Sequence, residues 1–306
     1  MRARNWVGGA ALVGLLAGLP PLLHNQYFTG VFIVCAIDGI WAASWDFFSG
    51  LTGRENFGHA LFIGGGAYAA AFLNGTFGFN PWLSLPAGVA IAVALGLLVG
   101  VPTLRLKGPY FALATLASAA IMQQVAINLW QYTGGTEGIY GLDTLFESSL
   151  GFYYFVLAVL GATVLVLGVA ARSRWGTILR AIRGDETACQ AAGVNVTVHK
   201  IASLAVSAAF AGLGGALYAQ YQQAVTPNDF DVFVSISVII MAYVGGIGSI
   251  WGAALGGILL NLMLELLRGM GEYRLWVYYL ILMVVLFFMR GGVVAPLWRR
   301  LSGRGA

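Results

Sequence analysis

Charge is what this sequence has least of. Asp, Glu, Lys and Arg make up only 9% of its 306 residues, against 59% hydrophobic residues and a mean hydropathy of +0.82. A soluble domain needs about a quarter of its residues charged to cover its surface with groups that water solvates. The composition therefore excludes an ordinary soluble protein and predicts a chain surrounded largely by lipid.

The sequence also lacks the patterns of several enzyme classes. It has no GxxxxGK[ST] phosphate loop, no GxSxG or HExxH motif and no spaced cysteine pairs. Its two cysteines, Cys35 in an apolar run and Cys189 in a charged segment, predict neither a disulfide nor a metal site. The basic residues are divided among short loops, so no nucleic-acid surface is expected. We expect no catalytic residue and no cofactor on this chain.

Long apolar runs are abundant, and a spanning helix needs about 20 such residues. They predict an all-α polytopic membrane protein, with residues 1–306 forming a single domain of about ten spans. Turn sequences at 74–81 and 245–249 divide two runs that are too long for one helix, so the third and eighth spans could instead be re-entrant. The predicted spans are Trp6–Leu23 (which also fits a signal peptide), Tyr27–Phe48, Phe57–Leu73, Trp82–Val101, Tyr110–Trp130, Gly151–Ala171, Ile201–Gln222, two within Val232–Leu264, and Leu275–Met289.

The basic residues predict the orientation. With ten crossings and a cytoplasmic N-terminus, every Lys and Arg except Arg268 and Arg274 falls on the cytoplasmic side, as the positive-inside rule requires. We therefore expect both termini in the cytoplasm of a bacterium and the spans in its inner membrane. The longest loops are then an extracytoplasmic segment at 131–150 and a cytoplasmic segment at 172–200.

The cytoplasmic loop predicts a short helix from Glu186 to about Ala192. Asp185 is a favourable N-cap, Glu186 suits the first turn, and Gly193 is typical of the position after the last turn. Such a helix in a basic loop has two interpretations. It could lie on anionic lipid headgroups, or it could dock onto a cytoplasmic partner.

The same loop resembles the EAA loop of importer-type ABC permeases, in the variant of the branched-chain amino-acid permeases. Arg54 and Glu55 stand where family members usually have an amide or a small residue, and the spacing from Glu186 to Gly193 is longer than the broader EAA pattern by one residue. Further stretches that match this family in order are Leu51–Ala60, Leu106–Thr115, Tyr132–Gly138, Gly193–Lys200, Ala208–Tyr218 and Gly245–Gly252.

The resemblance implies a permease subunit of an ATP-driven importer, with leucine, isoleucine and valine as solutes. It implies four kinds of partner: a second homologous permease chain, two cytoplasmic ATPases that bind ATP and Mg²⁺, an extracytoplasmic solute-binding protein, and membrane lipid. The expected ATPase-docking residues are Arg183, Asp185, Glu186, Ala188, Ala191 and Gly193.

Asp38, Gly65, Thr115 and Gly246 are the candidates for the solute path. A carboxylate at membrane depth is costly and normally faces protein or water, so Asp38 is expected to line the path. The glycine clusters at 64–66, 212–215 and 245–248 predict either close helix packing or helix breaks whose backbone groups bind a zwitterion.

Three other polar groups have structural interpretations. Asp46 is expected to pair with Arg54, Glu265 with Arg268 at the outer surface, and His59 to be a hydrogen-bonded residue at the membrane interface. Two alternative functions remain open from the sequence. One is a permease for urea or short amides, and the other is an ion- or proton-coupled carrier that uses Asp38.

Overall fold

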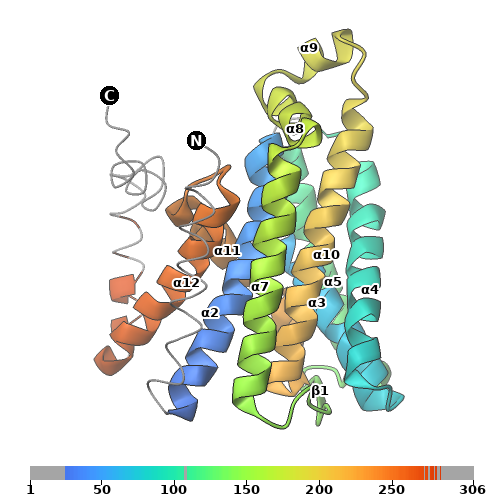
Figure 1. Cartoon of the computed structure of the whole chain (residues 1–306). Coiled ribbons are helices and arrows are strands. Elements are labelled where there is room, and N and C mark those ends of the chain that lie inside the picture. Colours follow the sequence, from blue (N-terminus) through green and yellow to red (C-terminus); the bar gives the residue numbers. More distant parts are fainter. Residues whose placement is uncertain are drawn as a thin grey trace.

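A computed structural model describes residues 25–106 and 109–271, together with a few single residues between 273 and 283. The described chain is a bundle of long helices that run roughly side by side (Figure 1). Six of its helices are long and apolar enough to cross a membrane. Together with the composition, they indicate an integral membrane protein. The helices and strands are α2 (Gln26–Trp45), α3 (His59–Ala71), α4 (Pro81–Thr103), α5 (Tyr110–Asn128), α6 (Trp130–Thr133), β1 (Ile139–Tyr140), α7 (Ser149–Arg172), α8 (Arg174–Gly184), α9 (Glu186–Ala191), α10 (Val196–Gln222), β2 (Ala224–Val225), α11 (Val232–Gly245) and α12 (Ile250–Leu266).

The second to ninth predicted spans each coincide with a helix. The division at 245–249 falls between α11 and α12, and the one at 74–81 covers the end of a π-helical turn, Phe72–Thr76, and the residues before α4. The predicted span Trp6–Leu23 lies outside the described residues, and so does almost all of Leu275–Met289. The count of ten spans and the cytoplasmic placement of both termini therefore stay predictions.

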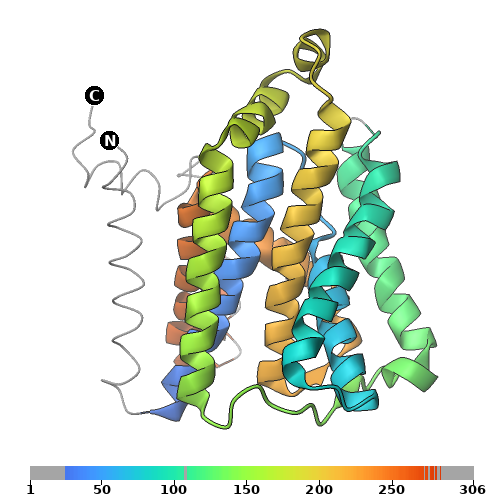
Figure 2. The ribbon, with the colours of Figure 1, turned by 45° about the vertical axis from the view of Figure 1, so that its right-hand side comes forward.

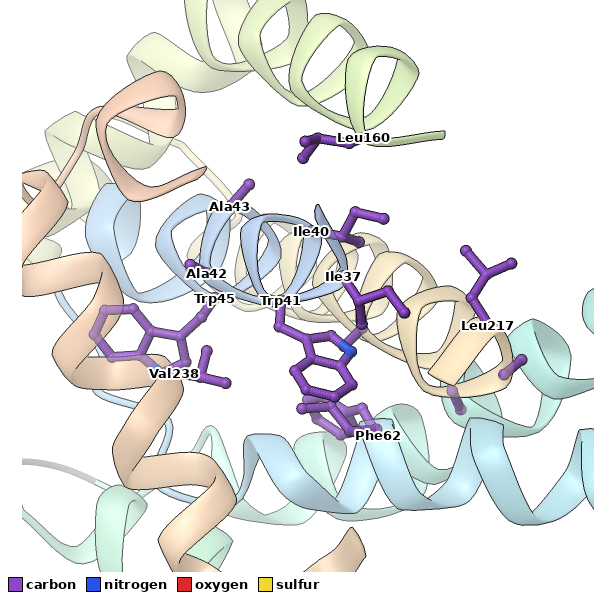
Figure 3. Close-up of a cluster of buried hydrophobic side chains, with 14 of the residues drawn as sticks. Ile37, Ile40, Trp41, Ala42, Ala43, Trp45, Phe62, Leu160, Leu217 and Val238 are labelled. Carbon is purple, nitrogen blue, oxygen red and sulfur yellow. The ribbon is translucent and has the colours of Figure 1, made fainter. Parts of the chain in front are cut away.

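Helix α2 is the central helix of the bundle. It packs against α7, α10, α11 and α12, and its side chains are buried along most of its length. Ile37 and Trp41 of α2 lie toward Phe62 of α3 and Leu217 of α10 (Figure 3). After Trp45 the helix continues for one π-helical turn, Asp46–Gly50, which is also buried.

Glycine allows α3, α4 and α10 to approach closely. A methyl group added to Gly66 of α3 would collide with the backbone of Gly212 in α10, and one added to Gly215 would collide with the backbone of Ile63. Both clusters lie inside continuous helices. The packing interpretation is therefore confirmed for 64–66 and 212–215, whereas the cluster at 245–248 does break the helix between α11 and α12.

The chain enters α11 through strand β2 and a short 3-10 turn in which Pro227 and Phe230 are buried. Strand β2 pairs with β1 at the end of the bundle opposite α9, and the following short turn, Pro227–Phe230, packs against α3 and α5 (Figure 1). Phe230 stacks on Tyr68 and lies against Gly64 of α3. Helix α11 itself has only 14 residues, fewer than the about 20 that a spanning helix needs. The re-entrant alternative for the eighth span stays a prediction.

Candidate functional site

The loop at 172–200 forms two helices, α8 and α9, at one end of the bundle (Figures 1 and 2). The predicted helix is confirmed as α9. Asp185 caps it by accepting hydrogen bonds from the backbone N–H groups of Thr187 and Ala188, at 2.8 and 3.0 Å. Gly193 follows the helix with φ +81°, which a side chain would disfavour. Helix α8, which buries Leu179 and Ile182, was not predicted.

Apart from Glu186, the side chains of α9 make little contact with the bundle. None of its residues is buried, and Ala188 and Ala191 are exposed. It projects beyond the ends of the spanning helices (Figure 2). An exposed helix with small side chains offers a surface on which another protein can pack closely.

The first residue of α9 ties this helix to the rest of the protein. One oxygen of Glu186 lies 2.5 Å from Nη2 of Arg54, and the other lies 2.5 Å from Nζ of Lys200. Burial works against the charge on Glu186, but the hydrogen bonds from Lys200 and Arg54 hold its pKa below the ordinary value of a glutamate. Glu186 is therefore a carboxylate at neutral pH.

Arg54 and Lys200 also donate hydrogen bonds to carbonyl groups in the loop after α4. Lys200, which is only 2% exposed, donates from Nζ to the carbonyl of Leu104 at 3.4 Å. Arg54 donates from Nη1 to the carbonyl of Leu106 at 3.1 Å. Glu186 thereby joins α9 to the start of α10, to the end of α4 and to the loop between α2 and α3.

A second polar junction connects α8 with the turn between α11 and α12. Arg183 donates from Nη1 to the carbonyl of Gly50 at 2.5 Å, and the N–H of Gly248 donates to the carboxylate of Asp46 at 2.7 Å. The expected pair of Asp46 with Arg54 is wrong, because the main-chain geometry of the π-helical turn directs Asp46 toward Gly248, while Arg54 reaches Glu186.

A cavity of about 790 Å³ lies beside the two junctions. Charged side chains of the loop after α2 and of α8 and α9 form part of its wall, and the first turns of α5 form another part. Its lining includes Arg54, Glu55, Arg183, Glu186, Leu113 and Leu116.

The four candidates for the solute path lie on different helices with different neighbours. Asp38 is buried in α2 and accepts a hydrogen bond from the side chain of Asn261 at 2.6 Å, while Gly65 lies against Leu95 of α4. Thr115 of α5 accepts from the N–H of Phe57 at 3.2 Å. Gly246 ends α11 with φ +107°. The part of the chain that the structure describes does not gather them into one cavity, and their role stays a prediction.

Two further expectations concern the pair of Glu265 with Arg268 and the place of His59. Arg268 pairs with Glu265 at 3.5 Å, as predicted, and Tyr27 of α2 joins this pair. His59 is hydrogen-bonded, with Nε2 at 3.0 Å from the hydroxyl of Ser44. Its side chain is fully buried within the bundle, and its depth in the membrane stays a prediction. The close packing of α2 on α3 encloses it.

Comparison with known proteins identifies the family. Residues 27–289 match the family model described as the permease component of branched-chain amino acid transport systems. This chain belongs to that permease family. No solved structure matches the permease significantly.

Three relatives show the breadth of the similarity. The permease is 32% identical over 255 residues to the LivM permease protein of the high-affinity branched-chain amino acid transport system of Salmonella typhimurium, covering 74% of this chain and 60% of the relative. It therefore spans 60% of the length of that relative. A probable LivH permease protein of Methanocaldococcus jannaschii is 25% identical over 82% of this chain and 86% of its own. A fructose import permease protein of Rhizobium meliloti is 26% identical over 69% of this chain and 62% of its own.

The partners of Glu186 were not predicted from the sequence. Arg54 lies 132 positions away from Glu186, and nothing local to either residue indicates the pair. The one available signal was the presence of Arg54 and Glu55 where the related permeases usually have an amide or a small residue. Both now have partners, since Glu55 accepts a hydrogen bond from the hydroxyl of Tyr243 at 2.8 Å.

Proposed function

We propose that this permease is a membrane subunit of an ATP-driven importer of branched-chain amino acids in a bacterial inner membrane. The observation that carries the proposal is α9, a helix without a buried residue that Glu186 ties to three elements of the bundle. A separate ATPase would seat on Ala188 and Ala191, and Arg183, Asp185 and Gly193 would set the position of the docking surface. ATP and Mg²⁺ would bind to the ATPase chains.

The exposed face of α5 supports a second permease chain as a partner. Of the six candidate spans, α5 is the least buried and also has the lowest mean hydropathy. A helix face in contact with lipid should be strongly apolar, so this exposed face fits lipid contact poorly. Its exposed positions include Leu113, Ile121, Gln124 and Asn128, which recur along one side of the helix. Exposed amides suit contact with another protein or with a water-filled path.

The other exposed helices differ from α5 in chemistry. The exposed positions of α7 include Leu165, Val166 and Val169, all of them aliphatic, as expected of a face in contact with lipid. The solute path would therefore run along α5, between this chain and its partner. The cavity beside Glu186 would form its cytoplasmic mouth, and an extracytoplasmic binding protein would deliver solute at the end that carries β1.

Uptake in proteoliposomes tests the function. The permease would be purified by a tag together with the chains that accompany it, and radiolabelled leucine uptake would be measured with and without ATP. We expect uptake that requires ATP and is inhibited by isoleucine and valine. Competition by urea or fructose instead would reassign the solute. Uptake driven by an ion gradient without ATP would replace the proposal with a coupled carrier.

A further inference from the structure

The side chain of Glu186 is held from both sides. Each of its two oxygens contacts a different cation, Arg54 on one and Lys200 on the other. Each cation in turn donates to a main-chain carbonyl of the segment after α4, at Leu106 and Leu104. We name Arg54, Glu186 and Lys200 the Glu186 clamp. Through it, α9 is connected with three separate parts of the bundle.

Burial makes the clamp strong on the side of Lys200. Its ammonium group is enclosed, since the residue is only 2% exposed, and a buried cation is costly unless an opposite charge accompanies it. Within the described chain, Glu186 is the carboxylate that pairs with it. Because no residue of α9 is buried, apolar packing contributes little to the position of this helix, so the clamp sets where α9 starts.

Arg54 connects the clamp with the cavity. It lies in the loop between α2 and α3, and both Arg54 and Glu186 line the 790 Å³ cavity together with Leu113 of α5. The next residue of the loop, Glu55, accepts a hydrogen bond from Tyr243 of α11. A displacement of α9 that keeps the clamp intact must therefore move the wall of the cavity and the segment leading into α3.

We propose that Arg54 and Lys200 are positioning residues that clamp Glu186, so that α9, the loop at 52–57 and the mouth of the cavity move as one unit when the ATPase acts on α9. The inference rests on the proposed importer function and names the contacts by which force on α9 reaches the solute path. Arg54 is the member that joins α9 to the cavity wall, whereas Lys200 joins it to α10.

The test compares Arg54→Gln with the matched control Arg105→Gln, in the complex purified through this chain with its ATPases. Arg105 is an exposed arginine beside the same carbonyls and makes no hydrogen bond or ion pair within the described residues. Three quantities would be measured: the amount of copurified ATPase, the rate of ATP hydrolysis, and the solute taken up per ATP. For Arg54→Gln we expect unchanged copurification and hydrolysis, with solute per ATP lowered about tenfold, the size of a strongly coupled contact. Arg54→Lys should restore part of the loss.

The outcomes separate the clamp from the importer function. Loss of copurified ATPase in Arg54→Gln would mean that Arg54 serves assembly, and it would overturn the inference. Equal solute per ATP in the wild type, Arg54→Gln and Arg105→Gln would overturn it as well. If the wild-type complex shows no ATP-dependent uptake, the importer function fails, and the clamp with it. In the double variant Arg54→Gln, Glu186→Gln, the loss should be no greater than in Glu186→Gln alone, because both changes break the same contact.

Discussion

At the scale of single residues, the α9 end of this permease is organised by charged side chains that meet backbone groups. Asp46 accepts the N–H of Gly248, Arg183 donates to the carbonyl of Gly50, and Lys200 donates to that of Leu104. A buried backbone group without a partner costs about 1–3 kcal/mol. The charged side chains therefore stabilise turns whose backbone groups have left the regular helical pattern, notably Gly248 with φ +79°.

Asp46 gives the residue-scale prediction. Asp46→Ala should lower the free energy of unfolding by about 1–3 kcal/mol, because the N–H of Gly248 loses its part-buried hydrogen bond to a carboxylate. Asp46→Asn should cost less, since an amide oxygen can still accept. Thermal unfolding of the detergent-solubilised permease would measure both. The effects of Asp46→Ala and Arg54→Ala should add, and a large coupling between them would contradict the absence of an Asp46–Arg54 pair.

At the scale of elements, hydropathy made most of the bundle predictable. Runs such as Tyr110–Trp130 and Gly151–Ala171 must be helical in lipid, because only a helix satisfies every backbone group of an isolated span, and α5 and α7 occupy them within a few residues. Helix α9 could also be predicted from the sequence, since Asp185 and Gly193 mark its two ends. Helix α8 was not predicted, although Ser173 caps it and its buried Leu179 and Ile182 are spaced as on one helix face. The buried turn Pro227–Phe230 could not be predicted, because it depends on α3 and α5, against which it packs.

Close approach between α3 and α10 gives the element-scale prediction. Gly66→Ala should destabilise the permease by about 1–3 kcal/mol, because the added methyl group collides with the backbone of Gly212 and the two helices must separate. Gly161→Ala in α7 is the matched control, since nothing lies within 4 Å of its added methyl group. It should be neutral or stabilise by up to about 1 kcal/mol. Equal losses in thermal stability for the two variants would show that glycine serves here for something other than packing.

At the scale of the whole molecule, the permease has two ends of different character and two kinds of exposed side. The α9 end carries the ion pairs of Glu186, whereas β1 and β2 close the opposite end (Figure 1). The exposed residues Leu165, Val166 and Val169 of α7 are aliphatic, whereas the exposed side of α5 contains amides. Hydropathy along the sequence does not separate these sides, since it identifies a span without showing which neighbour covers each face.

This difference between the sides leads to a prediction about assembly. Benzophenone attached to Ile121→Cys on α5 should crosslink to a second permease polypeptide upon illumination of native membranes, because Ile121 is 62% exposed on the face that carries Gln124 and Asn128. The matched position is Val166→Cys on α7, which is 49% exposed among aliphatic neighbours and should give lipid adducts. Both variants would be made in a chain whose own Cys35 and Cys189 have been replaced. Mass spectrometry of the adducts distinguishes the cases. If Ile121→Cys gives only lipid adducts while Val166→Cys captures a permease, then α7 forms the subunit interface. The solute path would then have to be sought on that side of the bundle.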